Sequence, residues 1–184
     1  MRTEEELRAA HVTGSPSSGP VVLVDYDPEW PLLFEREAER IRAAFGSRAL
    51  QIEHTGSTSI PGLAAKPIID ILLVVADSAD EAAYVPPLEA AGYVLRIREP
   101  DWFEHRLLKG ADPTANVHVF STGCAEIERM LLFRDRLRAN DAERELYEQT
   151  KRELAAREWE FVQQYADAKS EVVEAIIERA RTAA

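Results

Sequence analysis

The stretch His54–Leu72, HTGSTSIPGLAAKPIIDIL, combines a Gly-Ser turn with an acidic residue in the middle of an apolar strand. Residues 67–75, PIIDILLVV, form a continuous run of strand-forming side chains, which is typical of a central strand covered on both faces. A carboxylate inside such a strand is unfavourable to bury unless a cation or a metal ion compensates its charge. Asp70 therefore predicts either an internal ion pair or a metal site.

The turn before this strand suggests a ligand that both the turn and Asp70 contact. Alternation along the strand puts Asp70 on the same face as Leu72. Gly56 and Ser57 follow a shorter predicted strand, and a tight turn of this kind can direct backbone N–H groups and a hydroxyl toward phosphate oxygens. We therefore expect a phosphate pocket with Ser57 and Asp70 at its base and His54 at its mouth.

The rest of the chain predicts a mixed sheet followed by helices. Residues 27–46 have near-helical apolar spacing and end at a glycine. Residues 78–92 also look helical, but Pro86 and Pro87 should kink or split that helix. From Ala125 onward the pattern is helical, in about three segments. Strands are predicted over residues 48–54, 67–75, 93–99, 101–110 and 115–121. This order indicates an α+β fold.

Length and composition limit the class of protein. The 184 residues suit one domain. Residues 12–20, VTGSPSSGP, have a linker-like composition, so we expect a flexible N-terminal tail over residues 1–20 and a folded domain over 21–184. There is no apolar run long enough to cross a membrane and no signal-peptide pattern, which predicts a cytoplasmic protein without a membrane partner. The net charge of −11 argues against a broad nucleic-acid-binding surface.

Several cations occupy positions that predict an anion pocket in this acidic chain. Arg134, Lys151 and Lys169 each have apolar neighbours three or four residues away, which places them on the inward sides of their helices. Lys66 lies just before the strand that carries Asp70. We expect at least two of the four to point into a cavity, with Arg134 the most buried, unless acidic side chains simply neutralise them inside the fold.

Four segments resemble the GrpB family, a group of bacterial proteins with a nucleotidyltransferase-like fold. They are IEHTGSTSIPGLAAKPIIDILLVV, NVHVF, LLFRDRLR and YEQTKRELA, and the resemblance runs from about Val21 to Ala180. It implies a nucleotidyltransferase-like mixed sheet with a helical C-terminal half. It also implies binding of a nucleotide or other phosphorylated small molecule, with transfer of a nucleotidyl or phosphoryl group to a small acceptor. In some bacteria the family resembles a domain fused to dephospho-coenzyme A kinase.

The sequence departs from the metal-binding pattern of active nucleotidyltransferases. Those enzymes usually carry a second acid two residues after the first, so that two divalent ions can be held, but Leu72 stands there in this chain. Any divalent metal bound by Asp70 would need Glu104, His105 or His118, and Glu104 and His105 cannot share one strand face. Such mixed donors suit a transition metal at least as well as Mg²⁺. On this interpretation Asp70 and His118 are the catalytic candidates, although His118 could equally be a hydrogen-bonded structural residue.

A second interpretation belongs to a different functional class. The chain could be a non-catalytic ligand-binding or protein-interaction domain that lost the two-metal site and acts through a partner protein. Leu72 favours this alternative, whereas the polar groups concentrated around one strand favour an enzyme.

Overall fold

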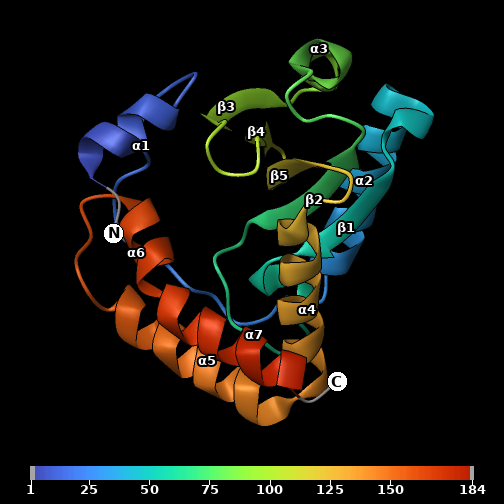
Figure 1. Cartoon of the computed structure of the whole chain (residues 1–184). Helices are drawn as coiled ribbons and strands as arrows, with labels where there is room; N and C mark the ends of the chain where they lie inside the picture. Colours follow the sequence, from blue (N-terminus) through green and yellow to red (C-terminus); the bar gives the residue numbers. More distant parts are fainter. Residues whose placement is uncertain (1–2, 183–184) are drawn as a thin grey trace.

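A five-stranded sheet of mixed direction forms the centre of the molecule, and helices cover both of its faces (Figure 1). The computed structural model describes residues 3–182. The strands are β1 (Gln51–Thr55), β2 (Ile69–Val75), β3 (Val94–Glu99), β4 (His105–Ala111) and β5 (Thr114–Ser121). They are arranged in the order β1-β2-β5-β4-β3, with β2 parallel to β5 and the other neighbours antiparallel. The α+β prediction is confirmed.

Helices dominate the second half of the chain, as predicted. The helices are α1 (Glu4–Ala10), α2 (Trp30–Phe45), α3 (Glu81–Ala90), α4 (Ala125–Ala139), α5 (Asp141–Ala155), α6 (Val162–Ala168) and α7 (Ser170–Thr182), with short 3₁₀ turns η1 (Gly46–Arg48) and η2 (Ser57–Ser59). The C-terminal half contains four helices rather than three, because α6 and α7 meet at a break beside Lys169. Helix α3 is not split by its two prolines; its side chains Tyr84 and Leu88 are fully buried in the core and hold it against the sheet. No helix within residues 3–182 is long and apolar enough to span a membrane.

The two faces of β2 belong to different parts of the core. Ile69, Ile71 and Leu73 pack into the cluster formed with α2 and α3. Leu72 and Val74 pack on the other face, against side chains of β5 and α4. Asp70 lies on this second face, beyond the end of the apolar cluster. The strand alternation read from the sequence therefore gives the correct side for the acidic residue.

The segment before Val21, for which composition predicts a flexible tail, is mostly exposed but contacts the rest of the fold at several points. Leu7 of α1 is only 3% exposed. His11 forms a β-bridge with Ile97, and the Val12 N–H donates to the carbonyl of Arg96 at 2.9 Å. Strand β3 is at the edge of the sheet, so its outer backbone groups are free to bond this segment. A linker-like composition does not reveal such a partner, because backbone hydrogen bonds need no particular side chain.

Candidate functional site

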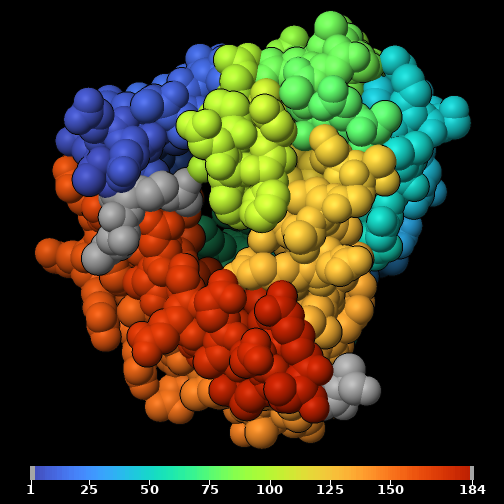
Figure 2. All heavy atoms as spheres, in the orientation of Figure 1, coloured from blue at the N-terminus to red at the C-terminus, as the bar shows by residue number. Residues whose placement is uncertain are grey.

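A cavity of about 500 Å³ lies between the sheet, the N-terminal segment and helices α5 and α6. Figure 2 shows a hollow in the surface between the N-terminal segment (blue), the β3–β4 region (yellow-green) and the helical half (orange to red). The side chains or backbone of the following polar residues line the cavity: His11, Ser17, Thr55, Gly56, Ser57, Thr58, Lys66, Asp70, Arg96, Glu99, Lys109, Asn116, His118, Lys151, Gln163, Tyr165 and Lys169.

A polar row crosses the sheet at the base of this cavity. The strand register pairs Asp70 of β2 with Asn116 of β5, and Asn116 with Lys109 of β4. The Asn116 amide donates to Asp70 Oδ1 at 2.9 Å, and His118 Nε2 lies 3.8 Å from the same oxygen. Burial raises the pKa of the Asp70 carboxyl, but a protonated His118, the Asn116 amide and Lys66 together hold it below its usual value. Asp70 is therefore a carboxylate, and it faces the cavity.

The Gly-Ser turn lies directly beside this carboxylate. Gly56 has a φ of 66°, and a Cβ added there would come within 2.2 Å of Asp70 Oδ2. Only glycine allows so close an approach of the turn to Asp70. Ser57 begins η2 and lines the cavity. The structure thus brings Gly56, Ser57 and Asp70 to one cavity wall.

All four lysines of the chain line this one cavity. They come from four places: Lys66 precedes β2, Lys109 is in β4, Lys151 is in α5 and Lys169 follows α6. None of the ion pairs closer than 4 Å within residues 3–182 involves a lysine. The Lys151 ammonium instead donates to the carbonyl of Ala64. Their charges are therefore not neutralised by paired carboxylates.

Burial, together with neighbouring cations, lowers the pKa values of these lysines. Burial, with Lys169 nearby, lowers the pKa of Lys151 from 10.5 to about 7. Burial lowers the pKa of Lys169 to about 8, even though Asp70 acts in the opposite direction. The pKa values of Lys66 and Lys109 are also lowered, again mainly by burial. The aromatic ring of Tyr165 compensates only partly, with Lys169 Nζ 4.7 Å from its centroid.

Three polar atoms of the lining are buried without a hydrogen-bond partner among the described residues. They are Arg96 Nε, Asn116 Oδ1 and the hydroxyl of Tyr165, a residue that is only 1% exposed. Buried polar groups in proteins nearly always have a partner. These atoms therefore mark places where a ligand or water completes the site.

Two residues predicted for the pocket lie elsewhere. Arg134 pairs with Glu53 and Asp135 and does not line the cavity, and Lys151, at 1% exposure, is more buried. His54 follows Glu53 in β1 and points to the opposite face of the sheet from Asp70. There it stacks on Phe34 with ring centroids 4.7 Å apart. Burial lowers the pKa of His54 to about 4, consistent with a neutral core residue.

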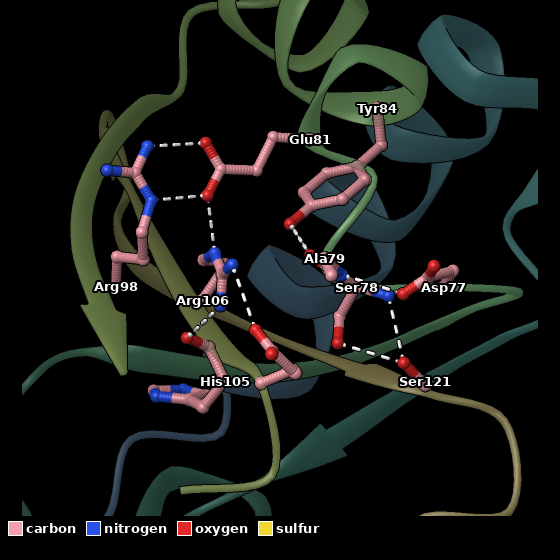
Figure 3. Close-up of polar contacts among 10 residues, drawn as sticks. Asp77, Ser78, Ala79, Glu81, Tyr84, Arg98, His105, Arg106 and Ser121 are labelled. Atoms are coloured by element: carbon pink, nitrogen blue, oxygen red, sulfur yellow. Dashed lines mark hydrogen bonds and ion pairs between the residues drawn. The ribbon is translucent and has the colours of Figure 1, made fainter. Parts of the chain in front are cut away.

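The predicted metal ligands do not converge. Glu104 binds Arg106, whose guanidinium lies on the α3 side of the sheet with Glu81; Figure 3 shows Glu81 between Arg98 and Arg106. His105 lies behind His118, with His105 Nε2 3.1 Å from His118 Nδ1. Within residues 3–182, no three His, Cys, Asp or Glu side chains are placed to hold one ion. The donors therefore do not fit a two-metal centre.

The sequence prediction missed four residues of the site. Lys109 follows His105 and Leu107 on one face of β4, so strand alternation could have identified it. Asn116 could have been found in the same way, two residues before His118. Arg96 lies at a register shift in β3, and Tyr165 is in a short helix, and neither gives a clear local signal.

Known proteins resemble this chain over most of its length. A UPF0157 protein of Halalkalibacterium halodurans is 61% identical over 97% of this chain and 92% of its own length. The crystal structure of conserved protein GrpB from Enterococcus faecalis has a TM-score of 0.76 at 32% identity, covering 86% of this chain and 96% of that chain. A protein of Mycolicibacterium paratuberculosis named dephospho-CoA kinase is 36% identical over 75% of this chain, but the match spans only 40% of that protein.

The match to a protein family covers most of the fold described above. Residues 20–179 match the family described as GrpB protein. This range includes the whole sheet, the Gly56 turn and all four lysines, whereas α1 lies before it. The chain therefore belongs to the GrpB family.

Proposed function

We propose that this protein binds a phosphorylated small molecule in the lysine-lined cavity. The observation that carries the proposal is that all four lysines of a chain with net charge −11 line one cavity, unpaired within residues 3–182. The lining has five basic side chains, the four lysines and Arg96, against two acidic ones, Asp70 and Glu99. Such an excess of positive charge attracts an anion.

Burying cations without carboxylates is unfavourable for the fold, and a bound anion would offset this. Lysine ammoniums are compact charges that can surround a tetrahedral phosphate from several directions. The cavity also offers the Ser57 hydroxyl and the turn at Gly56. These groups together support phosphate as the anionic part of the ligand.

The cavity volume of about 500 Å³ is in the range that holds a nucleotide-sized compound. The candidate ligands are nucleotides, phosphosugars and coenzyme A precursors. The name of the mycobacterial relative adds dephospho-coenzyme A to this set. Nucleotidyl or phosphoryl transfer through two metal ions is not part of the proposal, because Leu72 replaces the second carboxylate and no alternative donor set assembles within residues 3–182.

A thermal-shift screen of these compounds, with inorganic phosphate included, tests the proposal. We expect at least one phosphorylated compound to raise the melting temperature. Lys169→Met should lose most of that response and yet raise the melting temperature of the free protein, because it removes a half-buried charge that has no ion-pair partner among residues 3–182. Arg36→Met removes one exposed positive charge from α2, across the sheet, and should keep the full response. Absence of stabilisation by every anionic compound would contradict the proposal.

A further inference from the structure

A chain of side chains leads from β3 to the cavity wall and ends at His118. Glu99 Oε2 lies 2.6 Å from His105 Nδ1. His105 Nε2 lies 3.1 Å from His118 Nδ1. His118 Nε2 then faces Asp70 Oδ1 across 3.8 Å, and both of these residues line the cavity.

The hydrogen-bond partners determine the tautomer of each ring. A carboxylate is only an acceptor, so His105 Nδ1 carries the proton that is shared with Glu99. In a neutral His105, Nε2 is then an acceptor, and His118 Nδ1 must donate to it. A neutral His118 consequently has a bare Nε2 on the cavity side. Two acceptors, His118 Nε2 and Asp70 Oδ1, therefore face each other without a proton between them.

Donation from His118 Nε2 to Asp70 would need a cationic ring. In a cationic His118 both ring nitrogens donate, so His105 can stay neutral. With His118 neutral, the arrangement would need a cationic His105, whose Nε2 would donate to His118 Nδ1. His105 is only 4% exposed and packs against Trp102 and Phe120. Burial lowers the pKa of His105 to about 4, outweighing the effect of Glu99. The neutral state of His105 is therefore favoured near neutral pH.

We propose that His118 Nε2 and Asp70 Oδ1 together form an acceptor site for a hydroxyl or amine N–H donor of the bound ligand, with His105 and Glu99 as positioning residues. This inference rests on the proposed function and narrows the ligand class. The ligand is a phosphorylated compound with a hydrogen-bond donor near its phosphate, so that the lysines hold the anion while His118 and Asp70 recognise the donor. A ligand without that donor would leave the two half-buried acceptors facing each other, which is unfavourable.

Long-range proton–nitrogen correlation spectra of the histidine rings test the tautomers in the ligand-free full-length protein. The chain has four histidines, so the spectrum is simple to assign. At about pH 8, above the usual titration range of imidazole, we expect both His105 and His118 to carry their proton on Nδ1. A proton on Nε2 of His118 would overturn the inference.

The variant His105→Phe tests the positioning role. Phenylalanine keeps an aromatic ring against Trp102 and Phe120 but removes the acceptor for His118 Nδ1. We expect the proton of His118 to move to Nε2, where it can donate to Asp70. The signals of His54, whose Nε2 contacts Thr58, should stay unchanged and serve as an internal control. An unchanged His118 tautomer in this variant would contradict the role of His105.

Two related probes separate this inference from the proposed function. Glycerol phosphate carries hydroxyl donors near its phosphate, whereas propyl phosphate has none. Glycerol phosphate should bind severalfold more tightly and shift the His118 Nε2 resonance. Equal binding of both, with no Nε2 shift from either, would overturn the inference while supporting phosphate binding. Binding of neither would count against the proposed function, and the tautomer measurement would still decide the inference.

Discussion

The Asp70 carboxylate accepts a hydrogen bond from the Asn116 amide and also interacts electrostatically with several lysines. Lys66, Lys109 and Lys169 each have pKa values that Asp70 moves upward, against the larger effect of burial. One acidic side chain thus favours the charged forms of several lysines. It does not neutralise them, because none lies within ion-pair distance of it among residues 3–182. The closed ion pair, one of the two possibilities raised by the sequence, is therefore replaced by an acid at the wall of a cationic cavity.

Asp70→Asn should increase the affinity for inorganic phosphate severalfold. The change removes the negative charge that acts on Lys66, Lys109 and Lys169, and keeps a side chain that can still hydrogen-bond Asn116. Calorimetric titration of both proteins at low ionic strength measures the effect. If Asp70 were instead a metal ligand, the variant would lose a metal-dependent part of phosphate binding, which would contradict its role as an acid beside a purely cationic anion site.

Gly56→Ala should destabilise the protein more than Gly62→Ala. Both glycines have positive φ, 66° and 78°, so both substitutions incur backbone strain. Only at Gly56 does the new Cβ collide with Asp70; at Gly62 there is no atom within 4 Å. Chemical denaturation of the two variants should therefore give a clearly larger loss of unfolding free energy for Gly56→Ala. Equal losses would argue against close packing of the turn on Asp70.

At the scale of elements, the N-terminal segment closes one side of the cavity. Leu7, Ala10, His11 and Ser17 line it, although this segment lies outside the matched family region. Backbone hydrogen bonds hold the segment at both ends, to β3 through Arg96 and to α6 through the Val162 N–H, which donates to Ser17. The shape of this side of the cavity therefore depends on residues that precede the predicted domain start at Val21.

Gly14→Ala should weaken phosphate binding, whereas Gly19→Ala should not. A Cβ at Gly14 would lie 2.3 Å from the guanidinium of Arg96, one of the basic groups in the cavity, so Arg96 would have to move. Gly19 also has a positive φ, but a Cβ added there would meet no atom within 4 Å, which makes it a control for backbone strain alone. Parallel titration of the two variants with phosphate compares their affinities. Identical affinities would indicate that Arg96 takes no part in anion binding.

For the whole molecule, anion binding should be coupled to proton uptake. The lowered pKa values of Lys151 (about 7) and Lys169 (about 8) mean that both are partly neutral near pH 8. A bound anion favours the charged forms and raises these pKa values, so protons are taken up and affinity falls as pH rises above about 7, the lower of the two pKa values.

Calorimetry with sulfate, which does not titrate in this range, measures the coupling in buffers of different ionisation enthalpy. The wild-type protein should take up protons on binding, and Lys151→Met should take up fewer. Binding without any proton exchange near pH 8 would contradict the assignment of these lysines to the anion site.

Local sequence patterns determined much of the fold. The apolar run of β2, the alternation that puts Asp70 on the same face as Leu72, and the spacing of α2 all follow from side chains within a few residues of one another. The same reasoning indicated a turn at Gly56. Strand alternation also places Lys109 on the same face of β4 as His105, which the sequence prediction did not use.

Only the tertiary structure decided which cations reach the cavity and what closes it. Helical spacing places Arg134 on the inner side of α4, but the neighbour on that side is Glu53 of β1, which pairs with it. Likewise, composition predicts a linker before Val21, but the open edge of β3 gives that segment hydrogen-bond partners. Periodicity reports which way a side chain points along its own element. What it meets there depends on contacts between residues far apart in the chain, which local patterns do not contain.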